Sequence, residues 1–402
     1  MTELLCPAGN MERLQYAVHY GADAVYMGGE NFSLRAFSEN FDAQQLADAV
    51  QYLHARGKKA YITCNIFAHY EDIAAMGDYL RYLQQIHADA VLVADLGVLK
   101  LAKQVAPELP VHISTQANTT NALAARTYYE MGASRVVLAR ELSIEEIRRL
   151  RDHTPPELEL EAFVHGAMCI SYSGRCLLSS YLTGRDSNRG KCAQPCRWAY
   201  TIREQSRQEE LPILEDERGT YILNSKDLCM VEHLRELKDA GVDSFKIEGR
   251  MKTVYYAAVV TNAYRRAMDA MLAGEPVPSG LVQELEKAAN REFTTGFYFG
   301  RPDEHAQRYV SSKCVQSYEF VAVVRGSEQG RLRLEQRNKF SVGDELEVLS
   351  AGEMNGRTFT VSAIFDAETG EAQTSAPNPQ QLVYVPCGFA LAPMDILRRK
   401  QA

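Results

Sequence analysis

The chain has 402 residues, of which 46% are hydrophobic and 24% charged, a globular composition that excludes a disordered or fibrous chain. Its net charge of −8 argues against general binding to nucleic acid and leaves room only for a local basic patch. The length favours two domains. No apolar run is long enough to span a membrane, and the first residues lack the pattern of a signal peptide. We therefore expect a cytoplasmic protein.

Eight short, mostly apolar runs alternate with amphipathic segments over residues 1–275. Runs without polar alternation are typical of parallel strands that are buried on both faces. Ser143-Ile144-Glu145-Glu146 is a capping box that predicts a helix after the sixth run. The expected strands are Glu3–Cys6, Ala24–Met27, Lys59–Cys64, Ala90–Ala94, Val111–Ser114, Arg135–Ala139, Leu158–Val164 and Ser244–Ile247.

This alternation predicts an α/β protein with a (β/α)8 barrel. The alternative is an open doubly wound sheet, but no Gly-x-Gly-x-x-Gly follows the first run. A cysteine-rich insertion, residues 166–240, separates the seventh and eighth runs, and we expect it on the C-terminal face, where barrels of this kind place catalysis. Residues 276–314 predict a helical linker. Five strand-like runs in residues 315–402 predict a small all-β barrel.

The insertion contains five of the nine cysteines. In a reduced compartment, clustered cysteines indicate metal ligands or catalysts rather than disulfides. Thiolates select zinc or iron–sulfur clusters, and the absence of a Cys-x-x-Cys knuckle favours a cluster over zinc. Ordinary or redox-active cysteines are the remaining alternative. A four-iron cluster would use four of the five, which are Cys169, Cys176, Cys192, Cys196 and Cys229.

Polar side chains follow the expected strands where the barrel fold places its active site. Arg140 and Arg250 are suited to clamp carboxylates, and Lys246 to act as a point charge. Glu141 or Glu248 would orient a base or move a proton. The alternative is an inward layer of salt bridges among Arg140, Glu141, Lys246 and Glu248. The full set of candidates is Asn65, Asp95, Gln116, Arg140, Glu141, His165, Lys246, Glu248 and Arg250.

The insertion also carries aromatic and basic residues. Tyr172, Tyr181, Trp198 and Tyr200 are candidates to stack an extruded base, although packing of the insertion is an equally good reason for them. The densest basic segment is a candidate for phosphate contacts, with a solvated surface as the alternative. Its members are Arg185, Arg189, Lys191, Arg197 and Arg203.

The residues around the first two insertion cysteines resemble the signature of the U-32 peptidase family of collagenase-like peptidases. They read Glu161-x-Phe163-x-x-Gly166-Ala167-Met168-Cys169, followed by Gly174-x-Cys176-x-x-Ser179. Leu223–Leu228 and Lys246–Lys252 are similar to further segments of the family. Proteolysis itself is poorly supported, because no His-Glu-x-x-His or Gly-x-Ser-x-Gly is present and only His165 lies near Cys169.

Within the family, the chain is most similar to the prephenate-dependent tRNA uridine hydroxylases. This resemblance implies formation of 5-hydroxyuridine at the wobble position, with a 4Fe-4S cluster, prephenate as co-substrate, the tRNA anticodon loop as partner and iron–sulfur assembly proteins as further partners. Hydroxylation of ribosomal RNA or of a quinone precursor, and peptidase activity, remain alternatives.

The resemblance also assigns roles to residues. It implies Cys169, Cys176 and Cys192 as ligands, with Cys229 or Cys196 as the fourth. For the hydroxylation that it implies, His165, Glu248 and Glu141 are catalytic candidates because of their position at the ends of the expected strands. The expected substrate-binding residues are Arg140, Lys226, Lys246, Arg250, Gln116 and Asn65.

Overall fold

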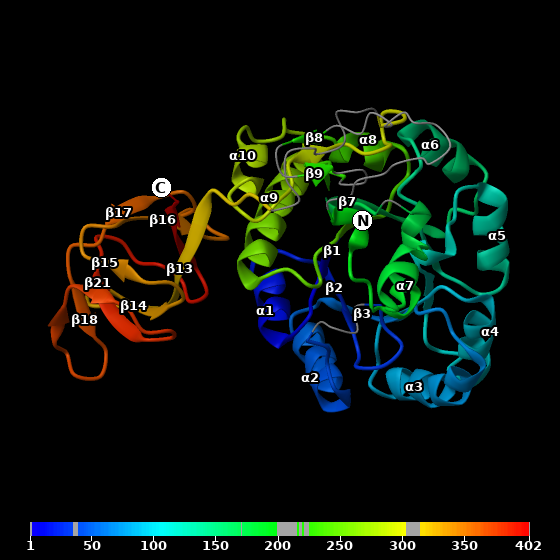
Figure 1. Ribbon diagram of the computed structural model, residues 1–402, viewed down its shortest axis with the longest axis horizontal. Helices are drawn as coiled ribbons and strands as arrows, with labels where there is room; N and C mark the ends of the chain where they lie inside the picture. Colours follow the sequence, from blue (N-terminus) through cyan, green and yellow to red (C-terminus); the bar gives the residue numbers. More distant parts are fainter. Residues whose placement is uncertain are drawn as a thin grey trace.

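The computed structural model describes residues 2–34, 39–169, 171–198, 215–216, 219–220, 225–302 and 314–401. Its larger part is a barrel of eight parallel strands, closed because the last strand pairs with both the first and the seventh (Figure 1). This closure confirms the predicted (β/α)8 barrel and excludes the open sheet. The strands are β1 (Glu3–Pro7), β2 (Ala24–Gly28), β3 (Lys59–Cys64), β4 (Ala90–Val93), β5 (Val111–Ile113), β6 (Arg135–Val137), β7 (Glu159–Ala167) and β11 (Ser244–Ile247).

Helices surround the barrel, and most of them begin after a residue whose side chain caps the helix. The capping box predicted at Ser143 is present, with Glu146 bonded back to the cap. Asp95, a candidate site residue, instead caps its helix by accepting a hydrogen bond from the Val98 amide. The surrounding helices are α1 (Met11–His19), α2 (Ala43–His54), α3 (Ile73–Gln85), α4 (Leu96–Val105), α5 (Ala122–Glu130), α6 (Ile144–Asp152), α8 (Leu234–Asp239) and α9 (Val254–Ala273).

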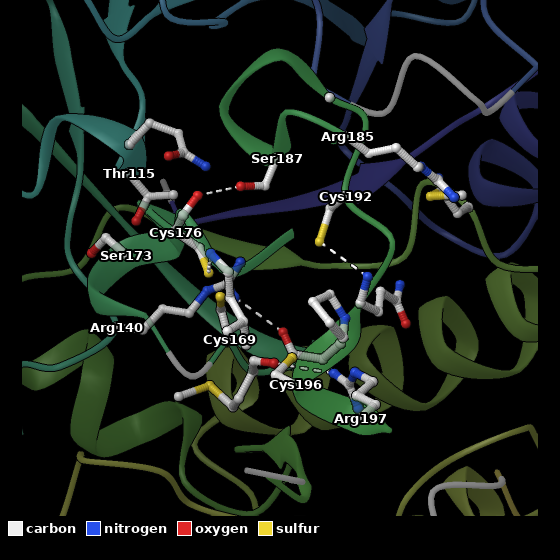
Figure 2. Close-up of a pocket in the computed structure, with 18 residues that line it drawn as sticks. Thr115, Arg140, Cys169, Ser173, Cys176, Arg185, Ser187, Cys192, Cys196 and Arg197 are labelled. Carbon is white, nitrogen blue, oxygen red and sulfur yellow. Dashed lines mark hydrogen bonds between the residues drawn. The ribbon is translucent and has the colours of Figure 1, made fainter. Parts of the chain in front are cut away.

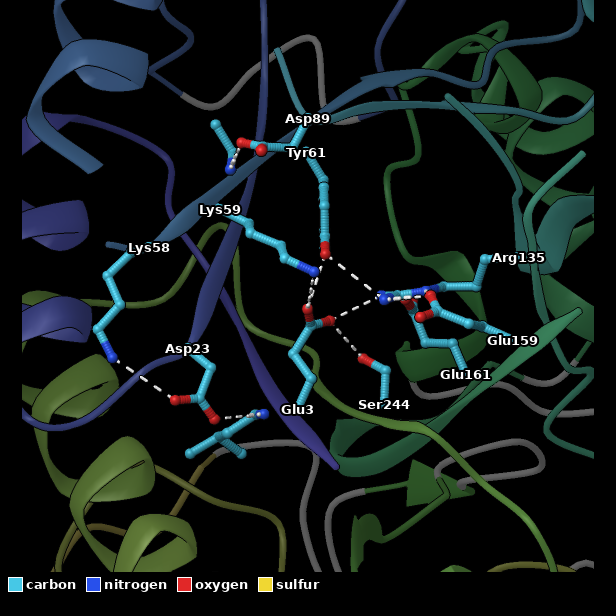
Figure 3. A network of polar contacts seen from close by, with 12 residues as sticks. Glu3, Asp23, Lys58, Lys59, Tyr61, Asp89, Arg135, Glu159, Glu161 and Ser244 are labelled. Atoms are coloured by element: carbon cyan, nitrogen blue, oxygen red, sulfur yellow. Dashed lines mark hydrogen bonds and ion pairs between the residues drawn. The ribbon is translucent and has the colours of Figure 1, made fainter. Parts of the chain in front are cut away.

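A network of charged side chains fills the barrel interior toward the N-terminal ends of the strands (Figure 3). Arg135 lies at its centre, with Nη1 2.7 Å from Glu3 Oε1 and 3.0 Å from Glu161 Oε2. Glu161 also accepts a hydrogen bond from Lys246 Nζ at 2.7 Å. The charges are buried but paired, as burial requires. Lys246 therefore forms an inward salt bridge, as one alternative expected, but its partner is Glu161 and neither Glu141 nor Glu248.

The insertion leaves the barrel after β7 and returns through β10 (Asp227–Cys229), which runs antiparallel to the end of β7. A short strand, β12 (Phe293–Thr294), continues this sheet outside the barrel. The rest of the described insertion contains only short helices and short strands. The helices are η3 (Tyr172–Gly174), α7 (Leu178–Thr183), η4 (Ser187–Arg189) and η5 (Pro195–Arg197), and the strands are β8 (Glu215–Asp216) and β9 (Gly219–Thr220).

Between the barrel and the second domain, the described linker is less helical than predicted. It contains α10 (Leu281–Leu285), after which Asn290 bonds back to the Ala288 carbonyl and pairs with Val315. None of the described helices combines the length and the apolar character needed to cross a membrane.

The C-terminal domain is an antiparallel sheet of eight strands, which agrees with the predicted all-β fold. In the described residues no ladder joins its first strand, β17, to its last, β19, so it is an open half-barrel. Its strands are β13 (Tyr318–Glu328), β14 (Arg331–Gln336), β16 (Glu345–Leu349), β17 (Thr358–Thr360), β18 (Ile364–Asp366), β19 (Ala372–Gln373), β21 (Leu382–Pro386) and β22 (Ile396–Lys400), beside the β15 (Phe340–Ser341) and β20 (Ser375–Ala376) pair.

The two domains share an apolar core and a buried ion cluster. Val323, Leu349 and Ile396 of the sheet pack into the core of the barrel. Arg398, which is fully buried, donates to Glu284 of α10 at 2.9 Å and also contacts Glu347 of β16. The sheet is therefore docked firmly against one side of the barrel (Figure 1).

Candidate functional site

Two cavities lie at the C-terminal end of the barrel. The larger, which we call the cysteine cavity, has a volume of about 170 Å³ and lies between the insertion and the barrel (Figure 2). Four cysteines line it together with three arginines, a combination that no other described cavity shares. These residues are Cys169, Cys176, Cys192, Cys196, Arg140, Arg185 and Arg197.

The smaller cavity, which we call the mouth cavity, has a volume of about 70 Å³ and opens among the strand ends of the barrel. It shares three lining residues with the cysteine cavity, namely Thr115, Gln116 and Arg140. The two cavities therefore adjoin and share part of their lining. Most of the predicted substrate-binding residues line the mouth cavity, together with the catalytic candidate Glu248. These substrate-binding residues are Asn65, Gln116, Arg140, Lys246 and Arg250.

Backbone amides surround the sulfurs of the cysteine cavity. The Leu178 amide donates to Cys176 Sγ and the Gln194 amide to Cys192 Sγ, each at 3.3 Å. Burial raises the pKa of Cys169, although the Ser171 amide and the Arg140 charge oppose it. Burial also raises the pKa of Cys196, to about 11. Amide donors stabilise a sulfur that carries negative charge, whereas burial favours the neutral thiol.

Arg140 and Arg197 bring positive charge to the same cavity. Arg140 Nη1 donates to the Ala167 carbonyl at 3.0 Å, and its guanidinium lies 4.0 Å from the centre of the Phe163 ring. Arg197 Nη2 donates to the Met168 carbonyl at 3.2 Å. Within the described residues, neither arginine has a carboxylate partner within 4.0 Å, and the buried Arg140 Nε and Arg197 Nη1 lack hydrogen bonds. An anionic guest would satisfy both groups.

The cysteines surround a volume and do not converge on a point. Among the described residues, no three His, Cys, Asp or Glu side chains are close enough together to hold a single metal ion. A tetrahedral zinc site needs four sulfurs at about 2.3 Å from one ion, which this spacing does not provide. A polynuclear cluster takes one thiolate at each of several irons, and a cavity lined by four cysteines offers that donor set.

Cys229, the fifth cysteine of the insertion, lies apart from the other four. It is buried in β10 and does not line the cysteine cavity. Its Sγ is 3.8 Å from the Tyr264 hydroxyl, and burial raises its pKa to about 11. Of the two candidates for a fourth ligand, the structure brings Cys196 to the other three.

His165 is close to Cys169 in sequence but is enclosed by aromatic rings. Its ring lies 5.3 Å from that of Tyr264 and 5.5 Å from that of Phe293, between centroids. Burial lowers its pKa to about 3, so it is neutral. Neither cavity includes it among its lining residues. β10 covers this part of β7, and that pairing was not evident in the sequence.

Glu141 and Lys226 also lie outside both cavities. Glu141 accepts hydrogen bonds from the amide and the hydroxyl of Ser173, at 2.6 Å and 2.9 Å, and so fixes the turn between Cys169 and Cys176. Lys226 Nζ is 3.0 Å from Glu292 Oε2. In this arrangement Glu141 positions the insertion.

In the mouth cavity, hydroxyl groups orient the charged residues. Arg250 Nη1 donates to Ser33 Oγ at 2.6 Å and to Thr63 Oγ1 at 2.8 Å. Glu248 accepts from the Tyr26 hydroxyl at 3.1 Å. Three cations and one carboxylate therefore line the cavity, which gives it a net positive charge suited to a small anion.

Arg189, one of the predicted phosphate contacts, instead attaches the insertion to the barrel by pairing with both carboxylate oxygens of Asp72. Arg175, in the same segment, donates from its Nε to the Gln116 carbonyl at 2.6 Å. Asn188 bonds to the backbone of Cys176. Tyr200 and Arg203 lie outside the described residues. Sequence reasoning missed Asp72 as an anchor, because its partner is distant in the chain.

Comparison with known proteins gives the chain a family. The model of peptidase family U32 matches residues 9–308, and the model of the family's C-terminal domain matches residues 316–398. The first covers the barrel and most of the linker, and the second covers the antiparallel sheet.

Three relatives illustrate the range of names in the family. The chain is 39% identical to "tRNA hydroxylation protein P1" of Bacillus subtilis, over 99% of this chain and 94% of that protein. It is 37% identical to "tRNA hydroxylation protein P" of Escherichia coli, over 96% of this chain and 93% of that protein. It is 36% identical to the "23S rRNA 5-hydroxycytidine C2501 synthase" of Escherichia coli, over 67% of this chain and 40% of that protein. Since the family models cover both domains, the chain belongs to peptidase family U32.

Proposed function

We propose that this protein hydroxylates RNA and that its substrate is tRNA. The observation that carries the proposal is the pair of adjoining cavities, one lined by four cysteines and the other positively charged. Relatives that match nearly the whole chain are named for tRNA hydroxylation, whereas the relative named for ribosomal RNA is covered over 40% of its length. The specific product we propose is 5-hydroxyuridine at the wobble position.

A 4Fe-4S cluster is the proposed guest of the cysteine cavity. Cys169, Cys176, Cys192 and Cys196 would hold it, and the group supplies one-electron redox chemistry when bound. Arg140 and Arg197 would balance its negative charge with their unsatisfied N–H groups. The amides that donate to Cys176 and Cys192 would stabilise the thiolates. Thiolate ligands, amide donors and guanidinium charge thus favour the same kind of guest.

The mouth cavity is the proposed site of prephenate, which is a dicarboxylate. Arg140, Lys246 and Arg250 line it and would bind carboxylates. Lys246 is held in place by Glu161, so its ammonium is oriented before the ligand arrives. Arg140 belongs to both cavities and would contact the ligand beside the cysteines.

The test compares tRNA nucleosides from a strain that lacks the gene with those from strains that carry the wild type or Cys176→Ser. Cys314→Ala is the matched control, because Cys314 is exposed and lines neither cavity. We expect 5-hydroxyuridine derivatives to disappear without the gene and with Cys176→Ser, and to return with the wild type and the control. The anaerobically purified wild type should contain iron and sulfide. Unchanged tRNA nucleosides would refute the tRNA assignment, and a change confined to ribosomal RNA would replace it.

A further inference from the structure

Three large aromatic side chains of the insertion are exposed, and each is close in sequence to a residue that lines the cysteine cavity. Tyr172, Tyr181 and Trp198 expose 52%, 87% and 44% of their surface. We call these three the aromatic rim. Each is within three positions of a residue that lines the cavity, namely Ser173, Leu178 and Arg197 respectively. Side chains of this size gain stability by burial, so their exposure marks this part of the insertion as a candidate binding surface.

The segment that carries the aromatic rim is basic in an acidic protein. Residues 168–198 contain five arginines or lysines and one acidic residue, whereas the whole chain has a net charge of −8. Arg189 is paired with Asp72. The side chains of Arg175, Arg185 and Lys191 are exposed, and Arg175 and Arg185 also donate hydrogen bonds to the Gln116 and Lys191 carbonyls. The rim therefore adjoins a local positive patch, and its partner should be an anion with flat apolar faces.

We infer that the aromatic rim binds the unpaired bases of an RNA loop by stacking, while the exposed cations beside it contact the phosphates. This inference rests on the proposed function and adds how the RNA is recognised. Aromatic side chains stack on bases of any sequence, but only where those bases are not enclosed in a duplex. The rim would accordingly select a loop over a helix and present one base to the cavity beside it.

The test measures binding of full-length, anaerobically purified protein to a labelled anticodon stem-loop RNA and to a fully paired duplex of the same length. Fluorescence anisotropy reports affinity. Trp198 is the only tryptophan of the chain, so quenching of its emission reports stacking directly. We expect the stem-loop to bind and quench, and the duplex to bind more weakly without quenching.

Substitutions distinguish stacking from general apolar contact. We expect Tyr181→Ala and Tyr181→Leu to weaken stem-loop binding roughly tenfold, and Tyr181→Phe to retain it, because only an aromatic ring can stack on a base. Leu272→Ala is the control, since Leu272 is 44% exposed at the end of α9 and outside the insertion. Thermal unfolding of each variant checks that the fold is intact.

Equal affinity and equal quenching for stem-loop and duplex would overturn the inference, as would wild-type affinity in Tyr181→Ala. Failure of any RNA to bind would also overturn it and leave the rim as a surface for a protein. A different result would contradict the proposed function alone. If rim variants lose RNA binding but deletion of the gene changes no nucleoside, the hydroxylase assignment is wrong while the binding surface stands.

Discussion

Arg189 and Asp72 form a two-point ion pair that joins the cysteine-bearing insertion to the loop after β3. Nη1 lies 2.7 Å from Oδ2, and Nη2 donates to Oδ1 at 3.1 Å. The neighbouring Asn188 accepts from the Cys176 amide and donates to the Cys176 carbonyl. A short path of contacts thus connects Asp72 to a proposed cluster ligand.

We therefore expect Asp72→Asn to loosen the insertion. The variant should lose iron faster than the wild type during anaerobic gel filtration and exposure to air, while the barrel unfolds at nearly the same temperature. Asp78→Asn is the matched control, because Asp78 pairs with Arg81 on an exposed face of α3. Equal iron retention in Asp72→Asn and Asp78→Asn would show that the ion pair does not position the cysteines.

The same pair predicts a dependence on pH. Hydrogen bonds from Arg189 lower the pKa of Asp72 to about 2, whereas an unfolded aspartate titrates at about 3.9. Its stabilising contribution is fully present above the unfolded value and is lost as the pH falls through about 2. The difference in melting temperature between wild-type and Asp72→Asn protein without metal should therefore be constant from pH 5 to pH 7. It should vanish near pH 2, and a constant difference down to that pH would contradict this assignment.

The ion network inside the barrel should be essential for stability. Glu161→Gln removes the charge that faces both Arg135 and Lys246 and leaves two buried cations undercompensated. Breaking a buried pair in this way costs about 3–5 kcal/mol, so we expect a loss of that size in the free energy of unfolding measured with urea. Adding Lys246→Met should recover part of the loss.

Glu145→Gln provides the control for this measurement. Its carboxylate pairs with Arg148 and Arg149 on an exposed helix face, where ion pairs contribute little. We expect no measurable change in its unfolding free energy. A loss in Glu161→Gln no larger than that of Glu145→Gln would mean that water or rearrangement compensates the buried cations.

Local sequence patterns predicted the barrel well, because a buried parallel strand and a capped helix each have a recognisable pattern within a short segment of sequence. β3 and β11 have the predicted bounds, and the capping box at Ser143 forms as expected. β7 was expected to end at Val164 but continues to Ala167, because β10 pairs with its last residues. That pairing encloses His165, and no local pattern reveals it.

The candidate site was predictable in composition but not in arrangement. Spacing alone placed Cys196 and Cys229 in the same insertion, and only the fold separates a cavity-lining residue from one buried in β10. The partner of Lys246 was equally hidden. Glu161 faces it only because β7 and β11 are neighbours in the closed barrel.

The domain interface should unfold together with the barrel. Arg398→Met leaves Glu284 and Glu347 with Lys287 as their remaining basic partner, since Lys287 Nζ lies 3.0 Å and 2.6 Å from their carboxylates. We expect a loss of about 3–5 kcal/mol in unfolding free energy. Because the two domains share an apolar core, calorimetry should still show one transition. Two separated transitions in the wild type would mean that the domains are independent.

The choice of the fourth cysteine can be decided by comparing two serine variants. Cys196 lines the cavity with Cys169, Cys176 and Cys192, whereas Cys229 lies in β10 beside Tyr264 of α9. We expect Cys196→Ser to lower the iron and sulfide content of anaerobically purified protein and to abolish RNA hydroxylation. Cys229→Ser should keep both, with at most a modest loss of stability from the altered core. The reverse result would require β10 to move its cysteine toward the cavity when the cluster binds, which would break the Asp227–Cys229 pairing with β7. Protection of the β10 amides from hydrogen exchange, compared with and without iron, would detect that movement.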